Sequence, residues 1–299
     1  MKGIRPASGL RPLPEDRRDA SLGGIFGQVD IAEVPSGDFV VAMPLRIKDQ
    51  GQSDFCTAFA VTEISEDQEE IELSPHFQFA LICMLRNDIG EWGSDLRSAF
   101  ASAVSGKGGS LEEALVPEAM RRKIDEGDRD HVADWRNWPE ECFRLAGYRA
   151  KGSYFKVDGR YDIFDNIRAA MWQFRAEKRT IGVGAMWKDS WTRDEDGIIR
   201  ESDDRGSFGH AFKIFGQKVI NGELHLCAQL SNGPVGDDGI YYFPRAVANR
   251  EFAPFGQFMF QDMPKETAKA YQAAGIAVSD TAVSRAWKRI RSLFNTKTK

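Results

Sequence analysis

The chain has 299 residues, enough for one large domain or for two lobes around a substantial core. Its formal net charge of −5 argues against a general affinity for nucleic acids, and no apolar run is long enough to span a bilayer. The N-terminus lacks the apolar stretch of a signal peptide, and the four cysteines show no paired metal-ligand spacing. We therefore expect a reduced, cytoplasmic setting and no metal site.

Residues 1–39 are rich in proline, glycine and charged side chains. This composition predicts an extended N-terminal arm that lies over the main domain instead of folding alone. Residues 40–47 then lead into a short polar loop.

A glutamine and a cysteine frame that loop, and the cysteine opens a predicted helix. Gln50 lies six residues before Cys56, after which apolar residues recur at helical spacing. Ser53 or Asp54 can cap this helix, which places Cys56 in its first turn, where the helix dipole favours a thiolate. The Gln50 amide can then stabilise an oxyanion beside the sulfur. If a histidine arrives from elsewhere in the chain, this arrangement suits acyl transfer.

Further helices are predicted in the first half of the chain. Ser74 and Pro75 are typical of a helix start, and the apolar residues that follow predict a buried helix. A third helix begins near Leu96 and ends at the glycines of 106–109. We expect a helical lobe over about residues 50–150.

The second half reads mainly as strands. The expected strands cover 154–157, 180–187, 209–216, 224–230 and 240–243, with an amphipathic helix over 163–178. Asn221-Gly222 is a strong hairpin turn. These elements predict a β-rich lobe over about 151–262 and an α+β fold with two lobes.

The C-terminal segment 263–299 has an amphipathic, basic pattern. Trp287, Ile290 and Phe294 fall on one helical face, with arginine and lysine around them. Such a helix can dock on the body of the protein or on a partner, or lie on an anionic membrane or a nucleic-acid backbone. The sequence does not discriminate between these occupants.

Four motifs in sequence order resemble the papain-like cysteine peptidases, and most closely the bacterial, archaeal and viral branch without a long prodomain. They are Asp49-Gln50-Gly51 with Cys56, Leu73-Ser74-Pro75, Gly209-His210-Ala211 with Gly216, and Asn232 with Gly236-Asp237-Asp238-Gly239. The resemblance spans roughly residues 10–260 and implies a papain-like fold with the active-site cleft between a helical lobe and an antiparallel β-rich lobe.

The resemblance also assigns roles to individual residues. It implies Cys56 as the nucleophile, His210 as general base and acid, Gln50 as oxyanion donor and Asn232 as the group that orients the imidazole. It further implies that Gly93, Ser94 and Gly209 bind the substrate main chain. The implied function is a cysteine endopeptidase that hydrolyses polypeptides through a thioester acyl-enzyme and needs no cofactor.

Two departures from the family pattern motivate an alternative function. No tryptophan follows Asn232, which should leave the pair of His210 and Asn232 more exposed to water. Asp54 and Phe55 stand where small residues are usual, and the Asp54 charge opposes thiolate formation. The alternative is a papain-like binding or structural module with weakened catalysis.

The orienting residue is itself open from the sequence. Counting back from Gly236 without gaps selects Gln229, whereas a hairpin that turns at 221–222 places a residue near 233 opposite His210 and so favours Asn232. His225 lies on the same hairpin but has no matching motif. Substrate preference and oligomeric state are not determined by the sequence.

Overall fold

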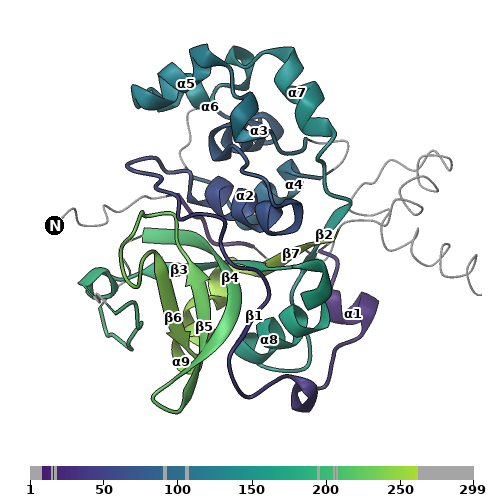
Figure 1. Cartoon of the computed structure of the whole chain (residues 1–299), viewed down its shortest axis with the longest axis vertical. Helices are drawn as coiled ribbons and strands as arrows, with labels where there is room; N and C mark the ends of the chain where they lie inside the picture. Colours follow the sequence, from purple (N-terminus) through teal and green to yellow (C-terminus); the bar gives the residue numbers. More distant parts are fainter. Residues whose placement is uncertain are drawn as a thin grey trace, which may run out of the picture.

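The structure, a computed structural model, describes residues 9–14, 16, 19–89, 93–104, 108–193, 196–204, 206 and 208–261, without the side chains of 192 and 193. The C-terminal segment predicted to be a basic helix lies outside these described residues. Figure 1 shows a lobe of helices above a lobe built on a sheet. This is the α+β architecture that the sequence predicts.

The helical lobe is arranged around one buried helix, α2. Its helices are α2 (Cys56–Glu69), α3 (Pro75–Arg86), α4 (Leu96–Ser102), α5 (Glu118–Asp125), α6 (Arg129–Ala133) and α7 (Glu140–Gly147). The predicted start of α3 is confirmed, because the Ser74 side chain accepts a hydrogen bond from the Phe77 N–H and Pro75 is the first helical residue. In Figure 1 α2 lies closest to the sheet and α5 lies at the far end of the lobe.

The β-rich lobe is one antiparallel sheet flanked by helices. Its strands are β1 (Phe39–Val40), β2 (Ser153–Lys156), β3 (Ile181–Trp187), β4 (Phe208–Ile220), β5 (Glu223–Gln229), β6 (Ile240–Pro244) and β7 (Gln257–Gln261), and its helices are α1 (Leu22–Phe26), α8 (Ile163–Gln173) and α9 (Arg245–Glu251). The strand order is β2-β7-β3-β4-β5-β6, with β1 paired to β4 beyond the end of β3. The sequence did not predict β7 or α9.

The hairpin of β4 and β5 fixes the register of the strand that carries His210. Asn221 and Gly222 have φ of 53° and 83°, as the predicted tight turn requires. The pairing runs from Ile220 opposite Glu223 and shifts at a bulge between Ile214 and Gly216. The last pair is Lys213 with Gln229.

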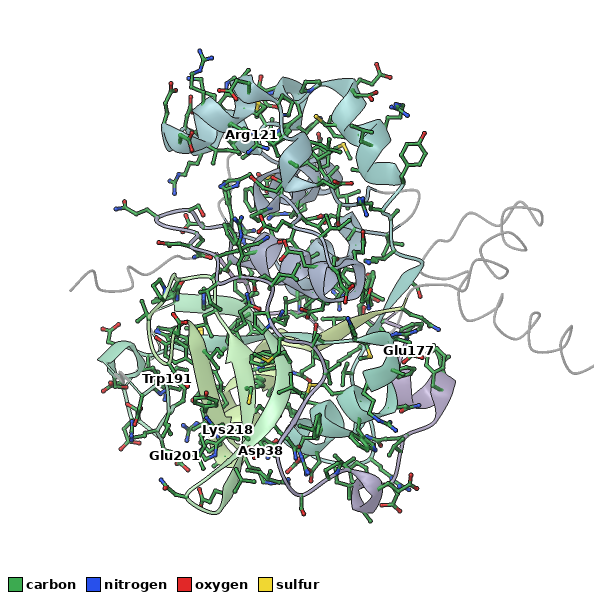
Figure 2. The ribbon with its side chains drawn as sticks, in the orientation of Figure 1. Asp38, Arg121, Glu177, Trp191, Glu201 and Lys218 are labelled. Carbon is green, nitrogen blue, oxygen red and sulfur yellow. The ribbon has the colours of Figure 1, made fainter. Side chains whose placement is uncertain are left out.

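Alternate residues of β4 face two different cores. Ala211 belongs to the core that contains the apolar side of α2, whereas Phe208 and Phe212 belong to the core inside the β-rich lobe. Trp191, which is labelled in Figure 2, is fully buried in this second core. The strand is therefore the wall shared by the two lobes.

Buried ion pairs join α2 to the β-rich lobe and to the segment before it. Lys213 of β4 pairs with Asp67 at 2.7 Å, and Thr180 donates a hydrogen bond to the same carboxylate. Lys48 pairs with Glu66 at 2.5 Å. Such pairs need partners in fixed positions, so they hold the two lobes in one relative arrangement.

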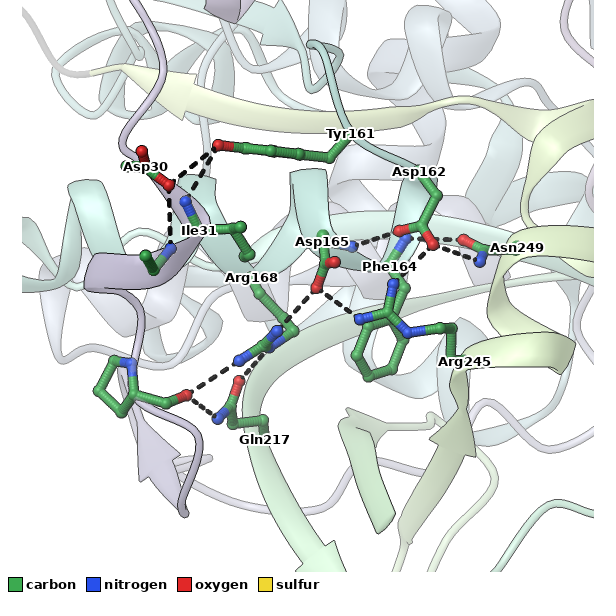
Figure 3. Close-up of polar contacts among 12 residues, drawn as sticks. Asp30, Ile31, Tyr161, Asp162, Phe164, Asp165, Arg168, Gln217, Arg245 and Asn249 are labelled. Carbon is green, nitrogen blue, oxygen red and sulfur yellow. Dashed lines mark hydrogen bonds and ion pairs between the residues drawn. The ribbon is translucent and has the colours of Figure 1, made fainter.

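Polar contacts also tie α8 to the sheet. Figure 3 shows the Arg168 guanidinium donating to the side chain of Gln217 on β4 at 2.6 Å and to the carbonyl of Pro35 at 2.9 Å. Arg245 of α9 pairs with Asp162 and Asp165 at the start of α8. In the part of the chain that the structure describes, no helix has the length and apolar character needed to cross a membrane.

Candidate active site

Cys56 is the first residue of α2, as predicted, but the predicted helix cap is wrong. The N-cap residue is Phe55, which makes no side-chain capping bond to any described residue. Ser53 instead donates from its hydroxyl and its N–H to the carbonyl of Gln50, and Asp54 pairs with Arg129 at 3.1 Å. Both candidate caps are therefore engaged in the loop and against α6.

The thiol of Cys56 is fully buried, and this burial outweighs the helix dipole. Burial, together with the smaller effect of the Asp54 charge that the sequence predicts, raises the pKa of Cys56 to about 12. The backbone N–H of Ala211 points to the sulfur and lowers the pKa in part. The sulfur thus lies against β4 at the residue that follows His210, and in this state it is a thiol.

His210 is enclosed by aromatic rings. Its imidazole is 0% exposed, with the ring of Trp187 at 5.7 Å and those of Phe208 and Phe212 at 6.2 Å. The expected greater exposure of this histidine is wrong, because these rings close over it. Neither ring nitrogen has a hydrogen-bond partner among the described residues, and burial lowers the pKa of His210 to about 4.

The register of the hairpin of β4 and β5 indicates which residue lies opposite His210 and could orient its ring. Gln229 is paired with Lys213, and its amide donates to the carbonyl of Arg46. Continued past that pair, the same register would place residue 232 opposite His210. The side-chain nitrogen of Asn232 is buried and makes no hydrogen bond to any residue that the structure describes.

Gln50 lies beside the start of α2 and is held by the segment that directly follows β5. The Ser231 hydroxyl donates to the side-chain carbonyl oxygen of Gln50 at 2.9 Å, and the Gln50 N–H donates to the Ser231 carbonyl at 2.8 Å. This bond fixes which amide atom is the acceptor and leaves the Gln50 amide nitrogen as the group that can donate near the sulfur. Sequence reasoning missed Ser231, whose only signal is its position next to Asn232.

The N-terminal arm passes directly over Cys56, between the two lobes. A Cβ atom on Gly9 would lie 2.9 Å from the Cys56 sulfur and 2.5 Å from the Asp54 carbonyl oxygen, so the arm backbone rests on the nucleophile candidate. Gly9 accepts a hydrogen bond from the Ser94 N–H at 2.6 Å, and Leu10 donates to the carbonyl of Gly209 at 3.2 Å.

Two of the three predicted substrate-binding positions, Ser94 and Gly209, contact the arm. Arg11 donates to the carbonyl of Ser94, Gly93 lies next to Ser94 with φ of 86°, and a Cβ on Gly209 would meet the Leu10 carbonyl at 2.3 Å. The backbone groups of Ser94 and Gly209 that could bind an extended peptide therefore bind the chain's own arm. The sequence carries no periodic pattern in the arm that could have predicted this placement.

The side chains at this site suit acyl transfer more than metal chemistry. Within the described residues, no cluster of three histidine, cysteine, aspartate or glutamate side chains could hold a metal ion, and all four cysteines are free and buried. The groove brings together a thiol, an amide and backbone donors. A histidine lies next to the residue whose N–H faces the thiol.

Several solved structures to which this chain is similar are cysteine proteases. Xylellain from Xylella fastidiosa is 18% identical, with a TM-score of 0.68 over 88% of this chain and 99% of that protein. Procathepsin L 3 of Tenebrio molitor is 17% identical, with a TM-score of 0.58 over 81% of this chain and 75% of its own. Procathepsin B from Trypanosoma congolense is 14% identical, with a TM-score of 0.55 over 86% and 83%.

At the level of sequence, no protein-family model matches the chain and no curated protein matches it. The similarity is therefore one of fold, and it extends over most of the chain and both lobes. The chain has the fold of the papain-like cysteine proteases.

Proposed function

We propose that the chain is a cysteine peptidase that hydrolyses peptide bonds in the groove between its two lobes. Cys56 is the nucleophile, His210 the base and acid, Asn232 the orienting group and Gln50 the oxyanion donor. The observation that carries the proposal is the position of the Cys56 sulfur, at the first turn of a buried helix and against the N–H of Ala211, next to His210.

The proposed reaction has two steps. The Cys56 proton passes to His210, the sulfur attacks the peptide carbonyl, and the oxyanion accepts hydrogen bonds from the Gln50 amide and the Cys56 N–H. The tetrahedral intermediate collapses to a thioester as His210 protonates the leaving amine. Water, deprotonated by His210, then attacks the thioester and returns the thiol.

This chemistry requires the arm to leave Cys56 and the His210 ring to turn toward the sulfur, because in the described state that ring packs against Trp187 and makes no hydrogen bond to a described residue. Cys56 and His210 are both uncharged at neutral pH in the described state, and Gly9 covers the sulfur. Displacement of the arm by a substrate admits water and a peptide to Cys56 and removes part of the burial that raises the pKa of its thiol.

The proposal is tested by turnover of an unfolded polypeptide. Cys56→Ala should abolish hydrolysis, whereas Cys227→Ala, which removes a thiol on the outer side of the sheet, should retain it. Both variants should give a single unfolding transition near that of the parent chain. Hydrolysis that persists in Cys56→Ala would exclude the assignment.

A second candidate function is a binding module that keeps the fold without efficient catalysis. The observation that favours it is His210, whose two ring nitrogens lack a hydrogen-bond partner among the described residues. A Cys56 thiol that alkylates like an ordinary buried thiol even when the arm is displaced would select this module over the peptidase.

A further inference from the structure

A cavity of about 590 Å³ adjoins the proposed site on the flank opposite to the arm. It lies between the loop 49–53 that carries Gln50, the start of α3, and the pair of helices α5 and α6. Its wall includes Gln50, the proposed oxyanion donor, and Phe55, the residue directly before Cys56, so the cavity borders the proposed site. Its volume is that of a binding pocket for a small ligand or a few residues of a peptide.

The lining combines apolar side chains with two carboxylates, Asp49 and Asp128, and two cations, Lys123 and Arg129. Phe55, Ile124 and Val132 supply aromatic and aliphatic surface. The two cations of the lining are already paired: Lys123 with Glu126 and Asp128, and Arg129 with Asp54. An ionised ligand group would have to compete for these partners, whereas an uncharged one would not.

His76 adds a polar group without a partner. Its imidazole lines the cavity, packed edge-on against Phe55 at 6.1 Å and Phe59 at 5.8 Å, and its Nδ1 has no hydrogen-bond partner within the described structure. Burial, with the positive charge of Lys48 nearby, lowers the pKa of His76 to about 4, so the ring is neutral at physiological pH. A neutral imidazole suits an aromatic or amphipathic side chain better than a carboxylate.

The cavity lies on the side where the proposed reaction releases its amine. The arm runs from Cys56 past Ser94 and Gly209 and on to Pro254, so it occupies the other flank. The loop that forms the cavity pairs with residues 231–233, through Gln50 to Ser231 and Gly233 to Lys48. That segment contains Asn232, the proposed partner of the histidine that protonates the leaving amine.

We propose that this cavity binds a large uncharged side chain, aromatic or aliphatic, from the substrate segment that follows the cleaved bond. The assignment rests on the proposed peptidase function. It gives the chain a preference on the leaving-group side that is set by α5 and α6, because these helices supply Ile124 and Val132.

The test uses the full chain and labelled tripeptides with a free N-terminus that carry Phe, Asp or Gly at the second position. Fluorescence anisotropy should show the Phe peptide binding at least about tenfold more tightly than the Gly or Asp peptide. Ile124→Trp, which fills the cavity, should remove this preference. Arg122→Trp adds the same side chain at an exposed position of α5 and should retain it.

Ile124→Ala serves as a second variant, because it enlarges the cavity and should shift the preference toward a Trp peptide. Equal binding of the Phe, Asp and Gly peptides, or an unchanged preference in Ile124→Trp, would overturn the cavity assignment. Binding requires no turnover, so its outcome is separate from that of the peptidase proposal. If the chain prefers the Phe peptide but cleaves no polypeptide, the cavity assignment stands and the peptidase proposal fails. If the chain cleaves polypeptides without this preference, the peptidase proposal stands and the cavity assignment fails.

Discussion

The thiol of Cys56 experiences two opposing effects, and their balance depends on what covers it. The first turn of α2 and the N–H of Ala211 favour the thiolate, while complete burial and the Asp54 carboxylate disfavour it. Burial is the larger effect and raises the pKa of the thiol to about 12. Helix position alone therefore does not make a cysteine reactive, and access of water to the sulfur determines whether it is.

Ser231 is expected to position Gln50 without contacting the substrate. Ser231→Ala removes the hydroxyl that holds the Gln50 carbonyl oxygen, so we expect about a tenfold lower kcat with little change in KM. Gln50→Ala should cost about 100-fold or more in kcat, because it removes the oxyanion donor itself. A Ser231→Thr variant that keeps the hydroxyl should recover much of the rate, and equal losses in Ser231→Ala and Ser231→Thr would contradict the positioning role.

At the scale of elements, the arm is the segment that controls the groove. Gly9→Val would place a side chain against the Cys56 sulfur and the Asp54 carbonyl, so it should displace the arm. We expect the rate of Cys56 alkylation at pH 8 to rise by about tenfold or more, because the exposed thiol loses part of the burial that raises its pKa. Mass spectrometry of the alkylated chain measures this rate.

Gly37→Val is the matched control, since a Cβ at Gly37 meets no atom within 4 Å. It should leave the alkylation rate unchanged. An alkylation rate in Gly9→Val equal to that of the parent chain would show that the arm does not shield the sulfur.

The sequence predicted elements well where their signals are local. The Ser74-Pro75 start of α3 and the turn at Asn221-Gly222 are encoded by residues that satisfy their own backbone. The predicted cap at Ser53 or Asp54 is wrong, because Ser53 donates to the Gln50 carbonyl and Asp54 pairs with Arg129 of α6. These are tertiary contacts, which the local sequence does not encode. The bulge after Ile214 likewise shifts the register of β4 and β5 by one residue, and counting residue pairs from the turn does not predict such a bulge.

At the scale of the whole molecule, the contact between the lobes contains more acid than base. Glu63, Glu66 and Asp67 on α2 face Lys48 and Lys213, and both carboxylate oxygens of Glu63 lack a partner among the described residues. Burial raises the pKa of Glu63 to about 8, with the two lysines lowering it in part. The folded chain therefore holds a proton there that the unfolded chain releases near its ordinary pKa of about 4.5.

This proton makes stability depend on pH. The protonated Glu63 carboxyl stabilises the folded chain relative to its ionised form. This stabilisation is fully present below about pH 4.5 and is lost as the pH rises through about 8. Glu63→Gln should therefore raise the free energy of unfolding at pH 8.5 by at least about 1 kcal/mol and change it little at pH 5. Urea unfolding of this variant and of the exposed control Glu72→Gln checks the prediction, and an equal gain at both pH values would contradict it.

The sequence predicts the arrangement of the two lobes, but it does not predict the burial of His210 or the position of the arm over Cys56. Alternation along β4 places Ala211 toward α2 and His210 toward the second core, which the pattern of Gly209 to Phe212 permits. The rings that bury His210 come from β3 and β4 together, and the arm reaches the groove from more than 40 residues away in sequence. Contacts of this kind depend on packing between distant segments and leave no local pattern.

The central claim is that Cys56 forms a thioester with the acyl part of a peptide, and mass spectrometry of the protein under acid quench measures it most directly. With an activated peptide ester as substrate, we predict an acyl mass on the peptide containing Cys56, formed faster in Gly9→Val and absent in Cys56→Ala. The absence of this adduct from the Gly9→Val chain, or its presence on another residue, would contradict the account.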